Sequence, residues 1–173
     1  MGRSFSFARS SFGSMSVAGG TLAANSSPEV RDGMSGLSAR LAAVVEALPL
    51  RPGIRVLEIG GAPGAAAREV ARRVGAGHVL VVDRSATGVE AIRRTAATEI
   101  AAGVLSVRCT SIEEFTLLPG EEPFDLAFAV RVGALDGRYP AAGAVAVERI
   151  AAALTPQGQL FVDGGDPLRE IPI

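Results

Sequence analysis

Short runs of valine, leucine and isoleucine alternate with helical patterns along most of the chain. The runs span residues 54–59, 79–82, 104–108, 124–130 and 159–162. Apolar residues at helical spacing predict helices at 37–48, at 65–74, after Thr87 and around 147–154. Alternation of this kind predicts βαβ crossovers. The sequence therefore indicates an α/β fold with a doubly wound, mainly parallel sheet.

The overall composition narrows the classes of function. The chain has 17 basic and 18 acidic residues, so no net field attracts nucleic acid or an anionic membrane. Its one cysteine, Cys109, excludes an internal disulfide and a structural zinc site, and we predict no metal. No apolar run reaches the ~18 residues of a membrane span. We expect a cytoplasmic protein without nucleic-acid or membrane partners.

A glycine-rich turn, 60–64, follows the first apolar run, where parallel sheets bind ligands. The spacing of a dinucleotide-binding turn fails at Ala62. Glu58 stands at the mouth of the predicted strand, and its carboxylate would repel a pyrophosphate and attract a cation. We therefore expect an adenosine-like ligand that carries positive charge and no phosphate.

Asp83 follows the second run directly, 19 residues beyond Gly64. That offset is close to the one at which an acid binds ribose hydroxyls, and a carboxylate can accept from two vicinal hydroxyls. Alternatively, Asp83 caps the next helix, a role that Ser85 or Thr87 can also take. Thr87 and Glu90 have the spacing of a capping box.

Four segments together resemble motifs of the class I S-adenosylmethionine-dependent methyltransferases. VLEIGGAPG at 56–64 is similar to their first motif, and Asp83 to the acid that ends their second strand. PFDLAF at 123–128 resembles their fourth-strand motif, and LTPQGQL at 154–160 the turn before their fifth strand. The likeness runs from about residue 50 to residue 165. It implies a Rossmann-like methyltransferase fold with S-adenosylmethionine as cofactor.

The resemblance also implies which residues bind the cofactor. Asp83 would hold the ribose hydroxyls with Arg84 beside the adenine, and the segment 110–112 would meet the adenine edge. Many relatives carry an acid where Thr110 stands and a glycine where Ala62 stands, and we expect both departures to weaken affinity. The full set is Glu58, Gly60, Gly61, Ala62, Gly64, Asp83, Arg84, Thr110, Ser111, Ile112, Val130 and Arg131.

Methyl transfer from a sulfonium is an in-line displacement, so alignment supplies much of the rate. A base is needed only where the acceptor must lose a proton first. No catalytic residue is assigned; the candidates are Asp136, Tyr139 and Asp163, each with a solvated loop residue as the alternative. Arg131 is expected to pair with a carboxylate of the cofactor or the acceptor.

Three further residues near these segments have ordinary structural interpretations. Arg138 lies in the same loop as Asp136 and Tyr139. His78 precedes the second run, at the end away from the site, and is expected at the surface. Cys109 is expected to be a small buried hydrophobe.

Both ends of the chain depart from the family pattern. Residues 1–33 are rich in serine and glycine, which predicts a flexible N-terminal tail ahead of one Rossmann-like cofactor-binding domain at 34–173; a transit peptide and a flap over the ligand are alternatives. At the other end, 164–173 is too short for the usual helix and strand pair. We expect five strands with that pair missing.

The fifth run would then be an unpaired edge. The N-terminal tail, residues 168–173 or a second subunit could cover it, and a homodimer is favoured. The sequence predicts a methyltransferase that acts on a small-molecule acceptor. Alternatives are a module that binds the cofactor without catalysis and a nicotinamide-dependent oxidoreductase, which Glu58 disfavours.

Overall fold

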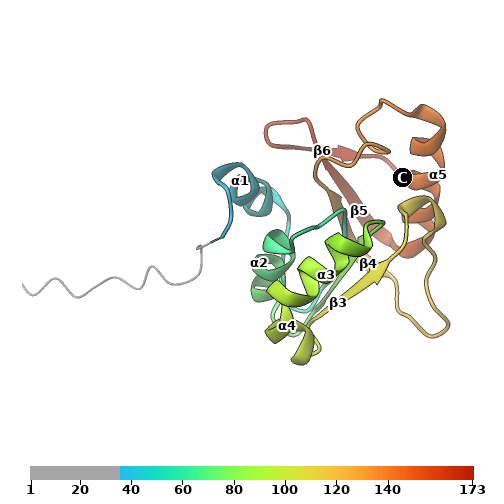
Figure 1. The fold of residues 1–173 in the computed structure, drawn as a ribbon. Helices are drawn as coiled ribbons and strands as arrows, with labels where there is room; N and C mark the ends of the chain where they lie inside the picture. Colours follow the sequence, from blue (N-terminus) through green and yellow to red (C-terminus); the bar gives the residue numbers. More distant parts are fainter. Residues whose placement is uncertain (1–35) are drawn as a thin grey trace, which may run out of the picture. The chain divides into compact units, whose positions relative to one another are not determined.

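A computed structural model describes residues 36–173 (Figure 1), and the predicted tail at 1–33 lies outside the described residues. The strands are β1 (Arg55–Ile59), β2 (His78–Asp83), β3 (Leu105–Cys109), β4 (Phe124–Ala129), β5 (Leu154–Asp163) and β6 (Leu168–Ile171). The helices are α1 (Ala39–Ala47), α2 (Ala65–Val74), α3 (Ala86–Thr95), α4 (Ala97–Ala101) and α5 (Pro140–Ala153), with a 3-10 turn η1 (Ile112–Glu114).

The strands form one sheet in the order β3-β2-β1-β4-β5-β6. The first five pair in parallel, and β6 pairs antiparallel with β5. Side chains alternate across the sheet: Val56 packs with α1, α2 and α3 on one face, and Leu57 packs with α5 and η1 on the other. The predicted doubly wound, mainly parallel fold is confirmed.

The predicted number of strands is wrong, because the chain turns back after Asp163 and adds β6. Its register pairs Asp163 with Leu168 and Leu160 with Ile171. The run LREI has no alternation of apolar and polar residues, so backbone hydrogen bonding to β5, and not its own pattern, makes it a strand. β5 is therefore not the unpaired edge from which a homodimer was expected. The homodimer stays a prediction without that support.

Some local boundaries also differ from the sequence-based expectation. Ser85 caps α3, with its hydroxyl accepting from the Gly88 N–H at 3.1 Å; Thr87 lies inside the helix, so the predicted capping box is wrong. β5 begins at Leu154, before the predicted run at 159–162. The register between β4 and β5 shifts between Phe124 and Leu126, and this irregular part of the pairing accommodates Pro156.

Two single residues also differ from expectation. Cys109 is exposed, because it ends the edge strand β3. His78 does lie at the first position of β2, away from the carboxyl end of the strand, but it is half-buried. Its ring contacts the Gly103 carbonyl at 3.0 Å and the Ser106 hydroxyl at 2.8 Å, and burial lowers its pKa.

Residues 36–173 contain no helix that is long and apolar enough to cross a bilayer. The same part of the chain has no group of three or more histidine, cysteine or acidic side chains arranged to hold a metal ion.

Candidate active site

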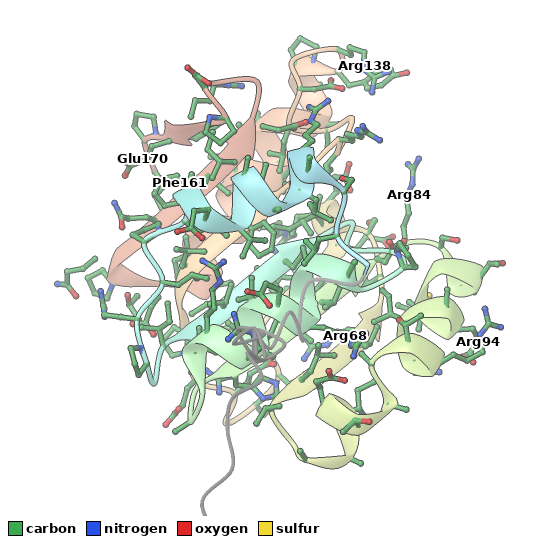
Figure 2. All side chains as sticks on the ribbon, turned by 90° about the vertical axis from the view of Figure 1, so that its left-hand side faces the viewer. Arg68, Arg84, Arg94, Arg138, Phe161 and Glu170 are labelled. Atoms are coloured by element: carbon green, nitrogen blue, oxygen red, sulfur yellow. The ribbon has the colours of Figure 1, made fainter. Side chains whose placement is uncertain are left out.

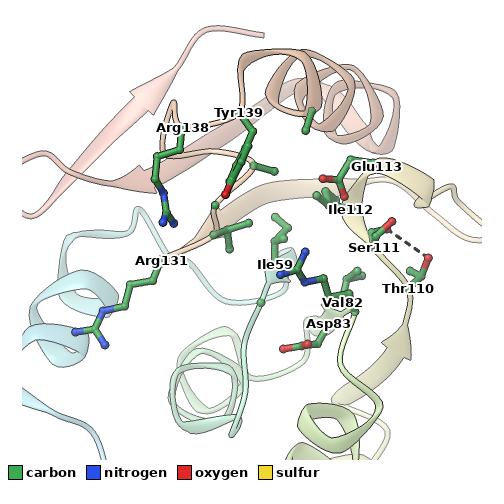
Figure 3. A pocket seen from close by; sticks show the side chains of 16 residues that line it. Ile59, Val82, Asp83, Thr110, Ser111, Ile112, Glu113, Arg131, Arg138 and Tyr139 are labelled. Atoms are coloured by element: carbon green, nitrogen blue, oxygen red, sulfur yellow. Dashed lines mark hydrogen bonds between the residues drawn. The ribbon is translucent and has the colours of Figure 1, made fainter.

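Two adjoining cavities open where the carboxyl ends of β1, β2 and β4 meet, and Figure 3 shows the larger one. Their volumes are about 540 Å³ and 150 Å³. Gly60 and Arg131 line both cavities. The other predicted residues divide between the cavities: Asp83, Arg84, Thr110, Ser111 and Ile112 line the larger one, and Glu58, Gly61, Ala62 and Val130 the smaller one. Gly64 lines neither.

The glycine turn brings the backbone to the cavities. Gly60 has a φ of +71°, and its N–H donates to the Val82 carbonyl at 2.8 Å. A Cβ on Gly60 would come within 2.9 Å of Val132 Cγ2, and one on Gly61 within 2.7 Å of the Glu58 carboxyl carbon. Gly64 has a φ of +95° and caps α2, so its role is to turn the chain into the helix.

Glu58 is a buried acid, with 5% of its surface exposed. Its Oε2 has no hydrogen-bond partner. Burial, together with the nearby charge of Asp83, raises its pKa to about 8, against the opposing effect of a hydrogen bond from the Ala67 backbone. The side chain borders the smaller cavity. A cation placed there would stabilise the carboxylate and meet its unpartnered oxygen.

Asp83 is half-buried at the end of β2. One carboxylate oxygen, Oδ1, accepts from the Ser85 N–H at 2.8 Å, so Asp83 shapes the entry into α3 while Ser85 caps it. The described residues make no hydrogen bond to its second oxygen, Oδ2, and the side chain lines the larger cavity. Arg84 is exposed and extends away from the sheet in Figure 2.

The segment after β3 forms one wall of the larger cavity. The Thr110 N–H donates to the Asp83 carbonyl at 3.1 Å, which fixes this segment against β2. The Ser111 hydroxyl donates to the Glu114 carboxylate at 3.0 Å, whereas Ile112 is buried. Glu113 also lines the cavity, a site residue that the sequence reading missed. The sequence did contain a hint of this role: Glu113 is an acid three positions after Thr110, close to where relatives carry an acid near the adenine.

Asp163 links α1 to the segment after β4 through hydrogen bonds. One of its oxygens accepts from the Arg131 N–H at 3.1 Å, and the other from Arg40 Nη2 of α1 at 2.8 Å. These contacts hold Arg131 at a φ of +59°, a value that only glycine otherwise adopts among the described residues. Asp163 lines neither cavity, so it is poorly placed to act as a base there. Arg40, which lines the smaller cavity, was not predicted from the sequence.

Asp136, Arg138 and Tyr139 lie in the loop before α5. Asp136 accepts from the Arg138 N–H at 3.0 Å and from Arg138 Nε at 2.6 Å. The side-chain hydrogen bond from Arg138 lowers the pKa of Asp136, which makes this carboxylate a weak base. Arg138 and Tyr139 line the larger cavity, and Tyr139 is mostly exposed. In Figure 3, both lie across the cavity from Asp83.

Comparisons with known proteins agree with this geometry. The family model described as a methyltransferase domain matches residues 56–158. A protein-L-isoaspartate O-methyltransferase of Methylorubrum extorquens (strain PA1) is 36% identical over 127 residues, which cover 73% of this chain and 49% of that protein. The chain thus spans about half the length of this curated relative.

Solved structures show the same fold. A SAM-dependent methyltransferase from Thiobacillus denitrificans, in complex with S-adenosyl-L-homocysteine, has a TM-score of 0.56 at 24% identity, covering 71% of this chain and 46% of that one. Haemonchus contortus phosphoethanolamine N-methyltransferase 1, in complex with phosphoethanolamine and S-adenosylhomocysteine, has a TM-score of 0.59 at 17% identity, covering 71% and 24%. The predicted resemblance is confirmed, and the chain belongs to the methyltransferase domain family.

Proposed function

We propose that the chain binds S-adenosylmethionine across the two cavities and transfers its methyl group to a small-molecule acceptor. When bound, this cofactor supplies a methyl group on a sulfonium, and a nucleophile that attacks the methyl carbon in line displaces the sulfur. The protein's part is to hold the donor, exclude water and align the acceptor.

The smaller cavity suits the amino-acid end of the cofactor. Its lining combines the carboxyl group of Glu58 with the guanidinium group of Arg40. An amino acid carries one ammonium and one carboxylate, so a cavity with groups of both signs complements it. The buried, unpartnered oxygen of Glu58 is the observation that carries the proposal, because a buried acid of this kind calls for a cationic or donating ligand.

The larger cavity suits the adenosine end. Asp83 offers a carboxylate oxygen to the ribose hydroxyls, and Glu113 offers a carboxylate near the backbone of Thr110 and Ser111. Glu113 supports adenine binding in place of the acid that is absent at Thr110. A volume of about 540 Å³ falls within the range of small-molecule sites.

Equilibrium dialysis with labelled S-adenosylmethionine tests the proposal. We expect saturable binding that S-adenosylhomocysteine displaces and NAD does not, because the glycine spacing of a dinucleotide-binding turn fails at Ala62. No binding to folded protein at millimolar ligand contradicts the proposal. Displacement by NAD would instead support the nicotinamide-dependent alternative.

A second candidate is a module that binds the cofactor without catalysis. It is favoured by the placement of Asp136 and Asp163, neither of which lines either cavity. The two candidates differ in turnover: the inactive module binds the cofactor but methylates no member of a panel of carboxylic acids, phenols, amines and thiols.

A further inference from the structure

The chemistry of the methyl acceptor follows from the junction of the two cavities; this inference rests on the proposed function. Gly60 and Arg131 line both cavities. A ligand with its adenosine in one cavity and its amino acid in the other must cross between these residues. The sulfonium joins those two parts of the cofactor, so the acceptor has to reach it beside Arg131.

Of the acids near this junction, Asp136 and Asp163 line neither cavity. Both oxygens of Asp163 accept hydrogen bonds, from Arg40 and from the Arg131 backbone. Asp136 is paired with Arg138. Glu58 is buried beneath the glycine turn, and a Cβ on Gly61 would touch it. The described acids that line the cavities are Glu58, Asp83 and Glu113, and the proposed function places them on the amino group, the ribose and the adenine of the cofactor. With these acids on the cofactor, the junction favours an acceptor that needs no deprotonation at neutral pH.

Arg131 adds a positive charge at the same place. Its side chain makes no ion pair or hydrogen bond with the described residues, whereas Arg40 and Arg138 are both paired. Its backbone is held at a φ of +59° by Asp163, a conformation that is strained in a non-glycine residue and is common at ligand sites. The strained backbone of Arg131 and its place in the lining of both cavities point to a ligand contact.

We propose that the acceptor is a carboxylate and that Arg131 binds it beside the sulfonium. The guanidinium fork matches a carboxylate in two parallel hydrogen bonds. One carboxylate oxygen forms a bond to the methyl carbon as the carbon–sulfur bond breaks, and the bonding pair of electrons stays on sulfur. The products are a methyl ester and a neutral thioether. No proton moves, so the step needs no base from the acids that line the cavities.

Binding of benzoate to the complex with S-adenosylhomocysteine tests this proposal, with benzamide as the neutral probe of the same shape. Amide spectra of isotope-labelled protein report both titrations. We expect benzoate to bind more tightly than benzamide. Arg131→Gln should weaken benzoate binding by about tenfold or more, as loss of a charge-assisted pair of hydrogen bonds implies. Arg131→Lys should recover part of the loss.

Arg94→Gln is the matched control, because Arg94 is an exposed arginine of α3 that lines neither cavity (Figure 2). We expect it to bind benzoate as the parent protein does. Equal binding of benzoate and benzamide, or unchanged benzoate binding in Arg131→Gln, overturns the carboxylate proposal while leaving cofactor binding intact. Failure of S-adenosylhomocysteine to bind at all is a failure of the proposed function instead.

Arg131 has one competing role, which is to hold the carboxylate of the cofactor itself. 5′-Methylthioadenosine lacks the amino-acid end, so it separates the two roles. If Arg131→Gln loses affinity for S-adenosylhomocysteine by tenfold or more and keeps its affinity for 5′-methylthioadenosine, Arg131 serves the cofactor and the acceptor proposal is overturned. Similar affinities of the parent protein and Arg131→Gln for S-adenosylhomocysteine support the acceptor role.

Discussion

At the scale of single residues, Glu58 couples the stability of the site to pH. Its pKa is about 8 in the folded protein and 4.5 in the reference state, so the folded protein keeps a proton that the unfolded chain releases between these values. Its contribution to stability is therefore full below pH 4.5 and is lost as the pH rises through about 8.

We expect Glu58→Gln to remove this dependence, because glutamine has a similar shape and no charge. The free energy of unfolding of the variant minus that of the parent protein should rise by on the order of 3 kcal/mol between pH 4 and pH 7. Urea unfolding at several pH values measures it. Parallel stability curves for the two proteins would show that Glu58 is not protonated in the fold.

Glu69→Gln is a control in which the pH dependence of stability has the opposite sign. Hydrogen bonds from Arg72 and Arg73, working against burial, hold the pKa of Glu69 at about 2. Its contribution to stability is present above pH 4.5 and is lost as the pH falls toward 2. The variant should therefore be less stable than the parent protein at neutral pH, and the difference should shrink in acid.

Asp83 is the second residue with a sharp expectation. Asp83→Ala should weaken binding of S-adenosylhomocysteine by roughly 1–3 kcal/mol, since it removes charge-assisted hydrogen bonds to the ribose. Calorimetry measures the affinity, with Glu90→Gln on the exposed face of α3 as the control. Unchanged affinity in Asp83→Ala would mean that the ribose lies elsewhere.

At the scale of elements, the turn between β1 and α2 decides whether a ligand can approach. We expect Gly60→Val to abolish cofactor binding, because its backbone has a φ of +71° and its Cβ would lie 2.9 Å from Val132 Cγ2. Gly103→Val is the matched control: its φ is +74°, with nothing within 4 Å of a Cβ. Both variants place a valine in a similar left-handed backbone conformation. The temperatures of thermal unfolding show how much stability each variant loses.

Cofactor titration then separates strain from site occupancy. Gly103→Val should bind S-adenosylhomocysteine like the parent protein at a temperature where it is folded. Tight binding retained in Gly60→Val would argue against the placement of the ligand at this turn.

Elements with a strong local pattern were predictable from the sequence, and those that depend on distant partners were not. β2 reads HVLVVD and is buried on both faces, which its apolar run already indicated. Residues 168–173 were one of three candidate covers for β5, but β6 was not predicted as a strand, because LREI is a strand only through its pairing with β5. Likewise, the strained conformation of Arg131 depends on Asp163, which lies 32 positions later at the end of β5.

At the scale of the whole molecule, the candidate site is assembled from segments far apart in sequence. Glu58 and Asp83 were predictable because a charged residue at the end of a buried apolar run is unusual. Arg40 was not, since its contact with Asp163 joins residues 123 positions apart. Glu113 was missed because the family pattern directed attention to Thr110, whereas the cavity is also lined by residues of the 3-10 turn that follows.

The assembly state is a separate prediction at this scale. β6 now forms the end of the sheet, and its exposed Arg169 and Glu170 are charges of the kind that discourage pairing between edges. If the predicted homodimer forms, we expect it to use another surface, so Arg169→Pro should leave the dimer intact. Light scattering at micromolar concentration measures this. A dimer that dissociates in Arg169→Pro would place the interface at β6.

A crystal structure of the chain with S-adenosylhomocysteine tests the central claim most directly. The account predicts adenosine in the larger cavity with its ribose hydroxyls on Asp83, and the amino group of the ligand against Glu58 in the smaller cavity. A ligand bound away from the turn at Gly60, or one whose amino group lies far from Glu58, would contradict it.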